Sequence, residues 1–258
     1  MRSFEPPMKS TFTSLFLVLL IALFNTCTTQ KDSPTPVLEL AILNEVVTLN
    51  PSGHAPLTAS ITIETTVATK VSIKVAGKHG GITDVIKDFN DFSTTHTIPV
   101  LGLYANFDNS VIVDFIDAGG TTLLGTTSYT IKTGPLPMGV YPDISIDTRQ
   151  AASMADGMTF VSYLAGSAPP FYPFIFDAYG EVRWYLDYSA GGELANLFYD
   201  DGMERLQNGN FYFGDTNSNS LYEIDFLGEI LNTWALPGYQ FHHNVQEKPN
   251  GNFLVTLL

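Results

Sequence analysis

The sequence has one cysteine, Cys27, and few basic residues. Twelve Lys and Arg side chains stand against 26 Asp and Glu, which gives a formal net charge of −14. A single cysteine excludes any internal disulfide. Nucleic-acid binding needs a basic surface to contact phosphates, so this composition predicts no nucleic-acid partner. The acidity fits the solubility of an exported protein.

The sequence also lacks a long apolar run. Its longest, "LFLVLLIALF" at residues 15–24, is too short to span a bilayer but suits the core of a signal peptide. We therefore predict a signal peptide over residues 1–26, with Met8 as an alternative start. "LFNTC" ends at Cys27 as an imperfect lipobox, which predicts an acylated Cys27; alternatively, this thiol is removed with the signal. Residues 27–36 would then form a tether.

This N-terminus predicts export, to the periplasm or as an outer-membrane lipoprotein of a Gram-negative bacterium. Membrane contact would be limited to the N-terminal lipid anchor. The oligomeric state does not follow from the sequence.

Helix-forming segments rich in Ala, Glu, Lys and Leu are missing, while 45% of the residues are hydrophobic and 15% charged. We predict an all-β, globular protein. In residues 37–133, stretches such as "ASITIETTVATKVSIKVAG" alternate apolar and polar residues at period two. Around seven such strands, with a "DAGG" turn near the end, predict an immunoglobulin-like β-sandwich.

A proline-rich linker (133–146) opens a region, 134–258, that contains a repeat. "FIFDAYGEVRWYLDY" (174–188) and "YEIDFLGEILNTWALPG" (222–238) share Asp-x-x-Gly-Glu and a following Trp, and their aspartates are 48 residues apart. The turns "LQNGNFYFGD" (206–215) and "KPNGNFLVTL" (248–257) alternate with them, 42 residues apart. Asp-x-x-Gly predicts a tight reversal, and Asn-Gly a two-residue hairpin turn. Four strands in such a period are typical of a β-propeller blade, so we predict an incomplete propeller of two to three blades.

These features resemble the bacterial aryl-sulfate sulfotransferases. The resemblance rests on the order of sandwich and propeller, on "FDAYGEVRWYLDY", "RLQNGNFYFGD" and "DFLGEILNTWALPG", and above all on "FHHNVQEKPNGNFLV" (241–255). The family has Phe-His-His-Asp at the last motif, whereas this chain has Asn244 in place of the Asp. The resemblance implies a six-bladed propeller behind the sandwich domain.

The resemblance further implies transfer of a sulfuryl group from a phenolic sulfate donor to a phenol acceptor, without the nucleotide donor PAPS and without a cofactor. A sulfated histidine carries the group in this family, and the resemblance implies that it lies in later blades, beyond residue 258. His242 and His243 would then have supporting catalytic roles.

In a regular strand these two side chains would point to opposite faces, so only one would face the site, with His243 favoured because Asn244 follows it. No nearby Cys, Asp or Glu has the spacing for a metal site with them. Arg183 reads as a surface or inter-blade residue, and Trp184 and Trp234 as packing residues of the repeat. The alternative function is a non-catalytic, exported propeller lipoprotein that binds a ligand or partner at the cell surface.

Overall fold

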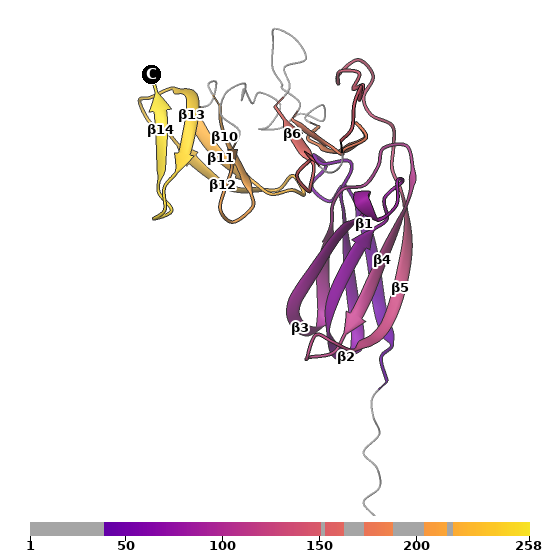
Figure 1. Cartoon of the computed structure of the whole chain (residues 1–258). Coiled ribbons are helices and arrows are strands. Elements are labelled where there is room, and N and C mark those ends of the chain that lie inside the picture. The colour runs from indigo at the N-terminus through magenta and orange to yellow at the C-terminus, as the bar shows by residue number, and fades with distance from the viewer. Residues whose placement is uncertain (1–38, 151–152, 163–172, 188–203, 216–218) are drawn as a thin grey trace, which may run out of the picture. The chain divides into compact units, whose positions relative to one another are not determined.

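The computed structural model describes residues 39–150, 153–162, 173–187, 204–215 and 219–258 (Figure 1). Its regular elements are strands, apart from one short 3₁₀ helix, η1 (Gly81–Thr83), so the chain is all-β. No helix in these residues is long and apolar enough to cross a membrane. The predicted signal peptide, the tether and Cys27 lie outside the described residues.

The immunoglobulin-like domain contains five strands in one sheet, with the order β1-β2-β4-β5 and with β3 paired to β2. They are β1 (Ile42–Leu49), β2 (Ala59–Val75), β3 (Val85–Val100), β4 (Asp108–Ile116) and β5 (Leu123–Lys132). The expected number of about seven strands is therefore wrong. The register shifts between Glu64 and Val71 bend β2 without ending it, because no Gly or Pro interrupts this β-branched segment.

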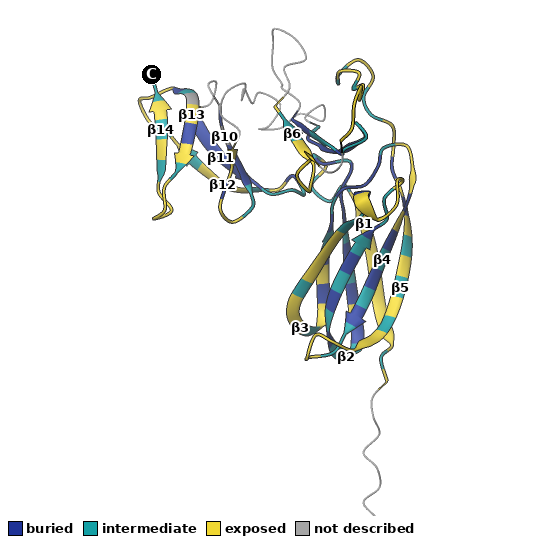
Figure 2. Ribbon diagram, in the orientation of Figure 1, coloured by how far each residue is buried: buried dark blue, intermediate teal, exposed yellow. Residues whose placement is uncertain are grey.

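Alternation along these strands builds the domain core. In β2 the odd positions from Ala59 to Val75 are the buried ones, apart from Val67, and β4 contributes Val111, Val113 and Phe115 (Figure 2). The predicted hairpin between β4 and β5 is confirmed. Asp117 closes its turn by accepting hydrogen bonds on Oδ1 from the Thr121 and Thr122 amides, at 2.9 and 3.0 Å.

The repeat region forms three small antiparallel sheets, β6-β7-β8, β12-β11-β10-β9 and β13-β14. Their strands are β6 (Thr159–Val161), β7 (Phe174–Phe176), β8 (Val182–Tyr185), β9 (Glu204–Arg205), β10 (Phe211–Asp215), β11 (Ser220–Ile224), β12 (Ile230–Ala235), β13 (Phe241–Glu247) and β14 (Phe253–Leu257). Each sheet has at least one tight turn at a predicted repeat motif.

The four repeat turns share one backbone geometry. In the first, the Gly180 amide donates to the Asp177 carbonyl at 2.9 Å and the Asp177 amide donates to the Glu181 carbonyl at 3.0 Å. The turns that end at Gly209, Gly228 and Gly251 repeat this pair of bonds, and all four glycines have positive φ. The prediction for Asp-x-x-Gly is confirmed, but the two-residue turn expected at Asn-Gly is wrong. Gly is the last residue of a three-residue loop there, which places it in the left-handed region that follows a type I turn.

Apolar cores join successive sheets. The core between the first and second small sheets includes Trp184, Phe211, Tyr222 and Ile224. The Trp184 indole Nε1 also donates to the Phe226 carbonyl at 2.7 Å. The contact of the second sheet with β13-β14 includes Tyr212, Leu221, Phe241 and Val245, with Trp234 packed against it. The packing role predicted for Trp184 and Trp234 is therefore confirmed.

Candidate active-site strand and its surroundings

His242, His243 and Asn244 form a bulge in β13. Phe241 pairs with Leu257 and Val245 pairs with Val255, so these three residues lie opposite Thr256 alone. Such a bulge interrupts the alternation of a strand and changes the direction of its side chains. The expectation that a regular strand sends the two histidines to opposite faces therefore does not apply. The His242 side chain is half-buried and Asn244 is exposed, whereas the His243 side chain lies outside the described atoms.

The two ends of the bulge are fixed by packing against the second sheet. Phe241 is 2% exposed and its ring covers Gly214 in β10, so closely that a Cβ built on Gly214 would lie 2.2 Å from the ring. On the other side, the Tyr212 hydroxyl donates to the Val245 carbonyl. Burial, with Glu204 nearby, raises the pKa of Tyr212. Tyr212 thus remains protonated, and the donor at this end of the bulge is kept.

Further hydrogen bonds hold β13 on both sides of the bulge. Gln240 and Leu258 exchange backbone hydrogen bonds of 3.0 and 2.8 Å before it, and the Glu247 carboxylate accepts from the Gln207 amide at 2.8 Å after it. The two histidines therefore lie in an irregular segment between anchored residues. The backbone of this segment is thus held at both ends, and the imidazole group of a histidine can bind anions or transfer protons.

The histidines of the immunoglobulin-like domain have structural partners. His96 Nε2 lies 3.1 Å from Thr69 Oγ1, and burial lowers the pKa of this imidazole. His54 Nδ1 lies 3.2 Å from the Asp187 carbonyl, and His79 stacks on Tyr179 with ring centroids 3.8 Å apart. In the part of the chain that the structure describes, no three His, Cys, Asp or Glu side chains are grouped to hold a metal ion.

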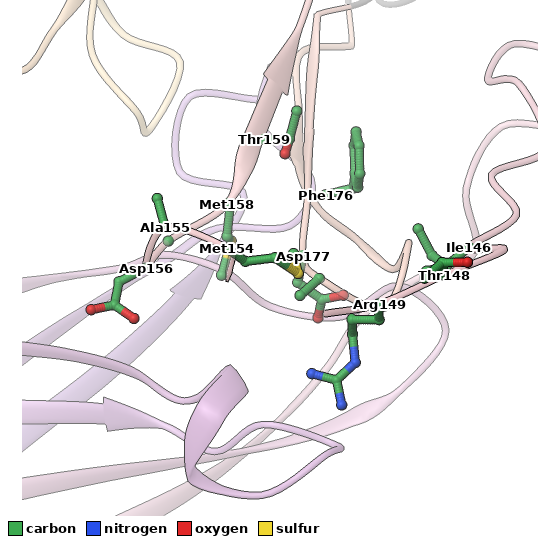
Figure 3. A pocket seen from close by; sticks show the side chains of 12 residues that line it. Ile146, Thr148, Arg149, Met154, Ala155, Asp156, Met158, Thr159, Phe176 and Asp177 are labelled. Atoms are coloured by element: carbon green, nitrogen blue, oxygen red, sulfur yellow. The ribbon is translucent and has the colours of Figure 1, made fainter. Parts of the chain in front are cut away.

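A cavity of about 320 Å³ lies near the start of the first small sheet (Figure 3). Its lining includes Arg149, Asp156, Met158, Phe176 and Asp177, and no residue of β13. The candidate histidines are therefore separate from this cavity.

Arg183 was expected at a surface or between blades, and this expectation is wrong in one respect: the side chain is fully buried, and it joins the first small sheet to the immunoglobulin-like domain. Its guanidinium donates to the Gly102 and Thr83 carbonyls at 2.8 and 3.1 Å, to the Tyr104 hydroxyl at 2.9 Å and to the Asp177 carboxylate at 3.1 Å. Asp177 has two roles, because its other oxygen accepts from the Tyr179 and Glu181 amides of the turn. The motif Asp-x-x-Gly-Glu-x-Arg signals the turn but not this contact.

Fold and site together define an all-β protein whose immunoglobulin-like domain packs on repeated sheets, the last of which holds a bulged His-His strand. Two family models match in the same order: the arylsulfotransferase Ig-like domain over residues 46–134 and the arylsulfotransferase (ASST) model over residues 144–257. The chain belongs to the arylsulfotransferase family.

A curated relative supports this assignment. The arylsulfate sulfotransferase AssT of Escherichia coli O6:H1 is 26% identical over 263 aligned positions, which cover 82% of this chain and 42% of the relative. The chain thus spans less than half the length of this relative. A solved structure of a protein of unknown function from Bacteroides caccae aligns with 72% of this chain and 65% of its own, at 16% identity and a TM-score of 0.29, which is too low to support an argument.

Proposed function

We propose that this chain is the N-terminal portion of an aryl-sulfate sulfotransferase that transfers a sulfuryl group from a phenolic sulfate ester to a phenol. The observation that carries the proposal is the match of both family models, in the order sandwich then catalytic domain, together with the relative named as a sulfotransferase. The fold suits this assignment, because the three small sheets have equivalent turns and shared cores. We interpret them as the first two to three blades of a six-bladed propeller.

The proposed chemistry has two steps and needs no PAPS, since the ester itself supplies the sulfuryl group. A histidine nitrogen attacks sulfur, an N–S bond forms and the S–O bond to the aryl group breaks, and the leaving phenolate takes a proton from a neighbouring imidazolium or from water. The acceptor phenol then gives its proton to the resulting base, its oxygen forms a bond to sulfur, and the N–S bond breaks to release the histidine. We place the nucleophile beyond residue 258, because the chain spans 42% of its relative.

The bulged histidines would support this transfer. Through its imidazole N–H, His242 or His243 would stabilise charge on the sulfuryl oxygens, or it would protonate the leaving phenolate oxygen. Because the bulge is anchored at Phe241 and Val245, such a donor would be positioned before the substrate binds.

The proposal is tested by treating the full-length protein with 4-nitrophenyl sulfate alone and mapping the products by mass spectrometry. We expect a sulfated histidine outside residues 1–258, and 4-nitrophenol release that continues only when a phenol acceptor is added. Residues 27–258 alone should give neither. An unmodified full-length protein that releases no 4-nitrophenol would contradict the proposal and favour a non-catalytic binding protein.

We further propose that the protein is exported and anchored through a lipid on Cys27. The apolar segment 15–24 followed by this cysteine supports the proposal. Radiolabelled palmitate should label the wild-type protein in a Gram-negative host and should not label a Cys27→Ala variant. Label on both proteins, or on neither, would refute the anchor.

A further inference from the structure

A second cavity, distinct from that in Figure 3, lies between the immunoglobulin-like domain and the turn that joins β9 to β10. Its volume is about 380 Å³, within the range of small-molecule sites, which often occur at domain interfaces. Ile73, Val75, Phe89 and Pro99 line one wall, and Phe226 lines the other. These apolar walls suit the body of a hydrophobic ligand.

Direct hydrogen bonds connect the parts of the chain that form the two walls. The Ser52 hydroxyl of the immunoglobulin-like domain donates to the Leu227 carbonyl at 2.6 Å, next to Phe226. The carbonyl of Phe226 accepts from the Trp184 indole at 2.7 Å. The segment that contains Phe226 is therefore bonded both to the immunoglobulin-like domain and to the first small sheet, and the cavity is present without a ligand.

The charges at this cavity are all of one sign. Lys87 and Arg205 are its charged lining residues, and both are exposed cations in a chain with a net charge of −14. Within the described part of the chain neither takes part in an ion pair, and the Arg205 guanidinium lies 5.6 Å from the centroid of the Phe226 ring. Two cations beside an apolar cavity complement an anion with a hydrophobic body.

One buried carboxylate, that of Glu223, is bonded to lining residues but does not itself line the cavity. Glu223 accepts from the side-chain amides of Asn208, Asn210 and Asn232, at 2.8, 2.6 and 2.7 Å, and it does not line the cavity. Asn208 and Asn210 do line it, and their side-chain amides donate to Glu223. Lys87 and Arg205 therefore remain the groups that meet a ligand's charge.

We propose that this cavity binds a hydrophobic organic anion, such as an aryl or alkyl sulfate, sulfonate or carboxylate. The apolar body lies between the Ile73–Val75 wall and Phe226, and the anionic group contacts Lys87 and Arg205. The site is separate from the bulged histidines, since no residue of β13 lines it. The inference does not depend on the proposed sulfuryl transfer.

Isothermal titration of the full-length protein with naphthalene-2-sulfonate tests the site. This sulfonate has a C–S bond and cannot donate a sulfuryl group. Replacing both cations, Lys87→Gln with Arg205→Gln, should raise Kd about tenfold, because each exposed charge contributes modestly to an ion pair. Lys132→Gln removes an exposed cation elsewhere and should leave Kd unchanged. The neutral 2-naphthol should bind more weakly than the sulfonate.

Equal affinity of the double variant and the wild type, or equal affinity for 2-naphthol and the sulfonate, would overturn the proposal. Ile86→Glu provides a second test, since Ile86 lines the cavity and is 62% exposed, so folding tolerates the change while the new carboxylate repels the ligand. Binding of the sulfonate by a protein without transferase activity would support this site while refuting the proposed function. Sulfuryl transfer by a protein that does not bind the sulfonate would support the proposed function and refute this site.

Discussion

At the scale of single residues, Arg183 joins the first small sheet to the immunoglobulin-like domain through a buried set of hydrogen bonds. It is fully buried and bonds to Asp177, to Tyr104 and to two carbonyls of the immunoglobulin-like domain. A buried ion pair gives little net stability compared with apolar replacements, but removing one partner leaves an uncompensated charge.

We therefore expect Arg183→Met to lower the free energy of unfolding by about 3–5 kcal/mol in urea denaturation. Lys78→Met is the matched control, because it removes the partly exposed 3.0 Å pair with Glu181, which is worth at most about 1 kcal/mol. Equal losses in the two variants would show that burial of the Arg183 pair has no special role.

The bulged strand depends on Gly214, because the Phe241 ring occupies the space that a side chain at position 214 would need. Gly214→Ala should destabilise the protein by about 1–3 kcal/mol through overpacking, and should lower transferase activity by displacing the start of the bulge. Gly134→Ala is the control, because nothing lies within 4 Å of a Cβ at that position. Unchanged thermal unfolding and activity in Gly214→Ala would contradict this packing.

At the scale of elements, the equivalent repeat turns can be compared with each other. Gly228 and Gly251 have φ of +86° and +78° in the same type of turn, but only a Cβ on Gly228 would meet another group, Ser52 Oγ at 2.7 Å. Gly251→Ala should cost about 1–2 kcal/mol for the left-handed backbone alone. Gly228→Ala should cost more by about 1–3 kcal/mol. Equal melting temperatures for the two variants would mean that this turn does not dock on the immunoglobulin-like domain.

Glu223 links three elements, because its carboxylate accepts from asparagines of the β9–β10 turn and of β12. Burial by itself would raise the pKa of Glu223, but the three amide bonds outweigh it and the pKa lies below its usual value. Stability from this group is thus present above the usual glutamate range and is lost as pH falls through the lowered pKa. Glu223→Gln should reduce the loss of stability between about pH 5 and pH 3, measured by urea denaturation. An unchanged pH dependence would contradict the role of these bonds.

The same elements show how far the sequence predicts the structure. Period-two alternation and positive-φ glycines are local signals, so the β-class, the β4–β5 hairpin and the Asp-x-x-Gly turns are predictable. The number of strands is not, because a bend at Glu64–Val71 and a true strand end have similar sequences. The three-residue loop at Gly209 differs from the expected two-residue turn by one additional residue, Gln207, before Asn-Gly.

The candidate site could be predicted in its residues but not in its geometry. "FHHN" marks the His pair, yet the bulge depends on where Val245 and Val255 pair, and Phe241 and Val245 are held there by packing on Tyr212 of β10. Burial of Arg183 depends likewise on carbonyls of Thr83 and Gly102, about 100 and 81 residues away. Contacts of this range leave no local pattern in the sequence.

At the scale of the whole molecule, we expect the full-length protein to transfer a sulfuryl group with help from the bulged histidines, as proposed above. The most direct measurement is kcat for 4-nitrophenyl sulfate and phenol, without PAPS, in the wild type and in His242→Asn and His243→Asn. We predict measurable transfer by the wild type and a loss of about 100-fold or more in one variant, His243→Asn in preference, with unchanged thermal unfolding. No transfer by the wild type, or full activity in both variants, would contradict the account.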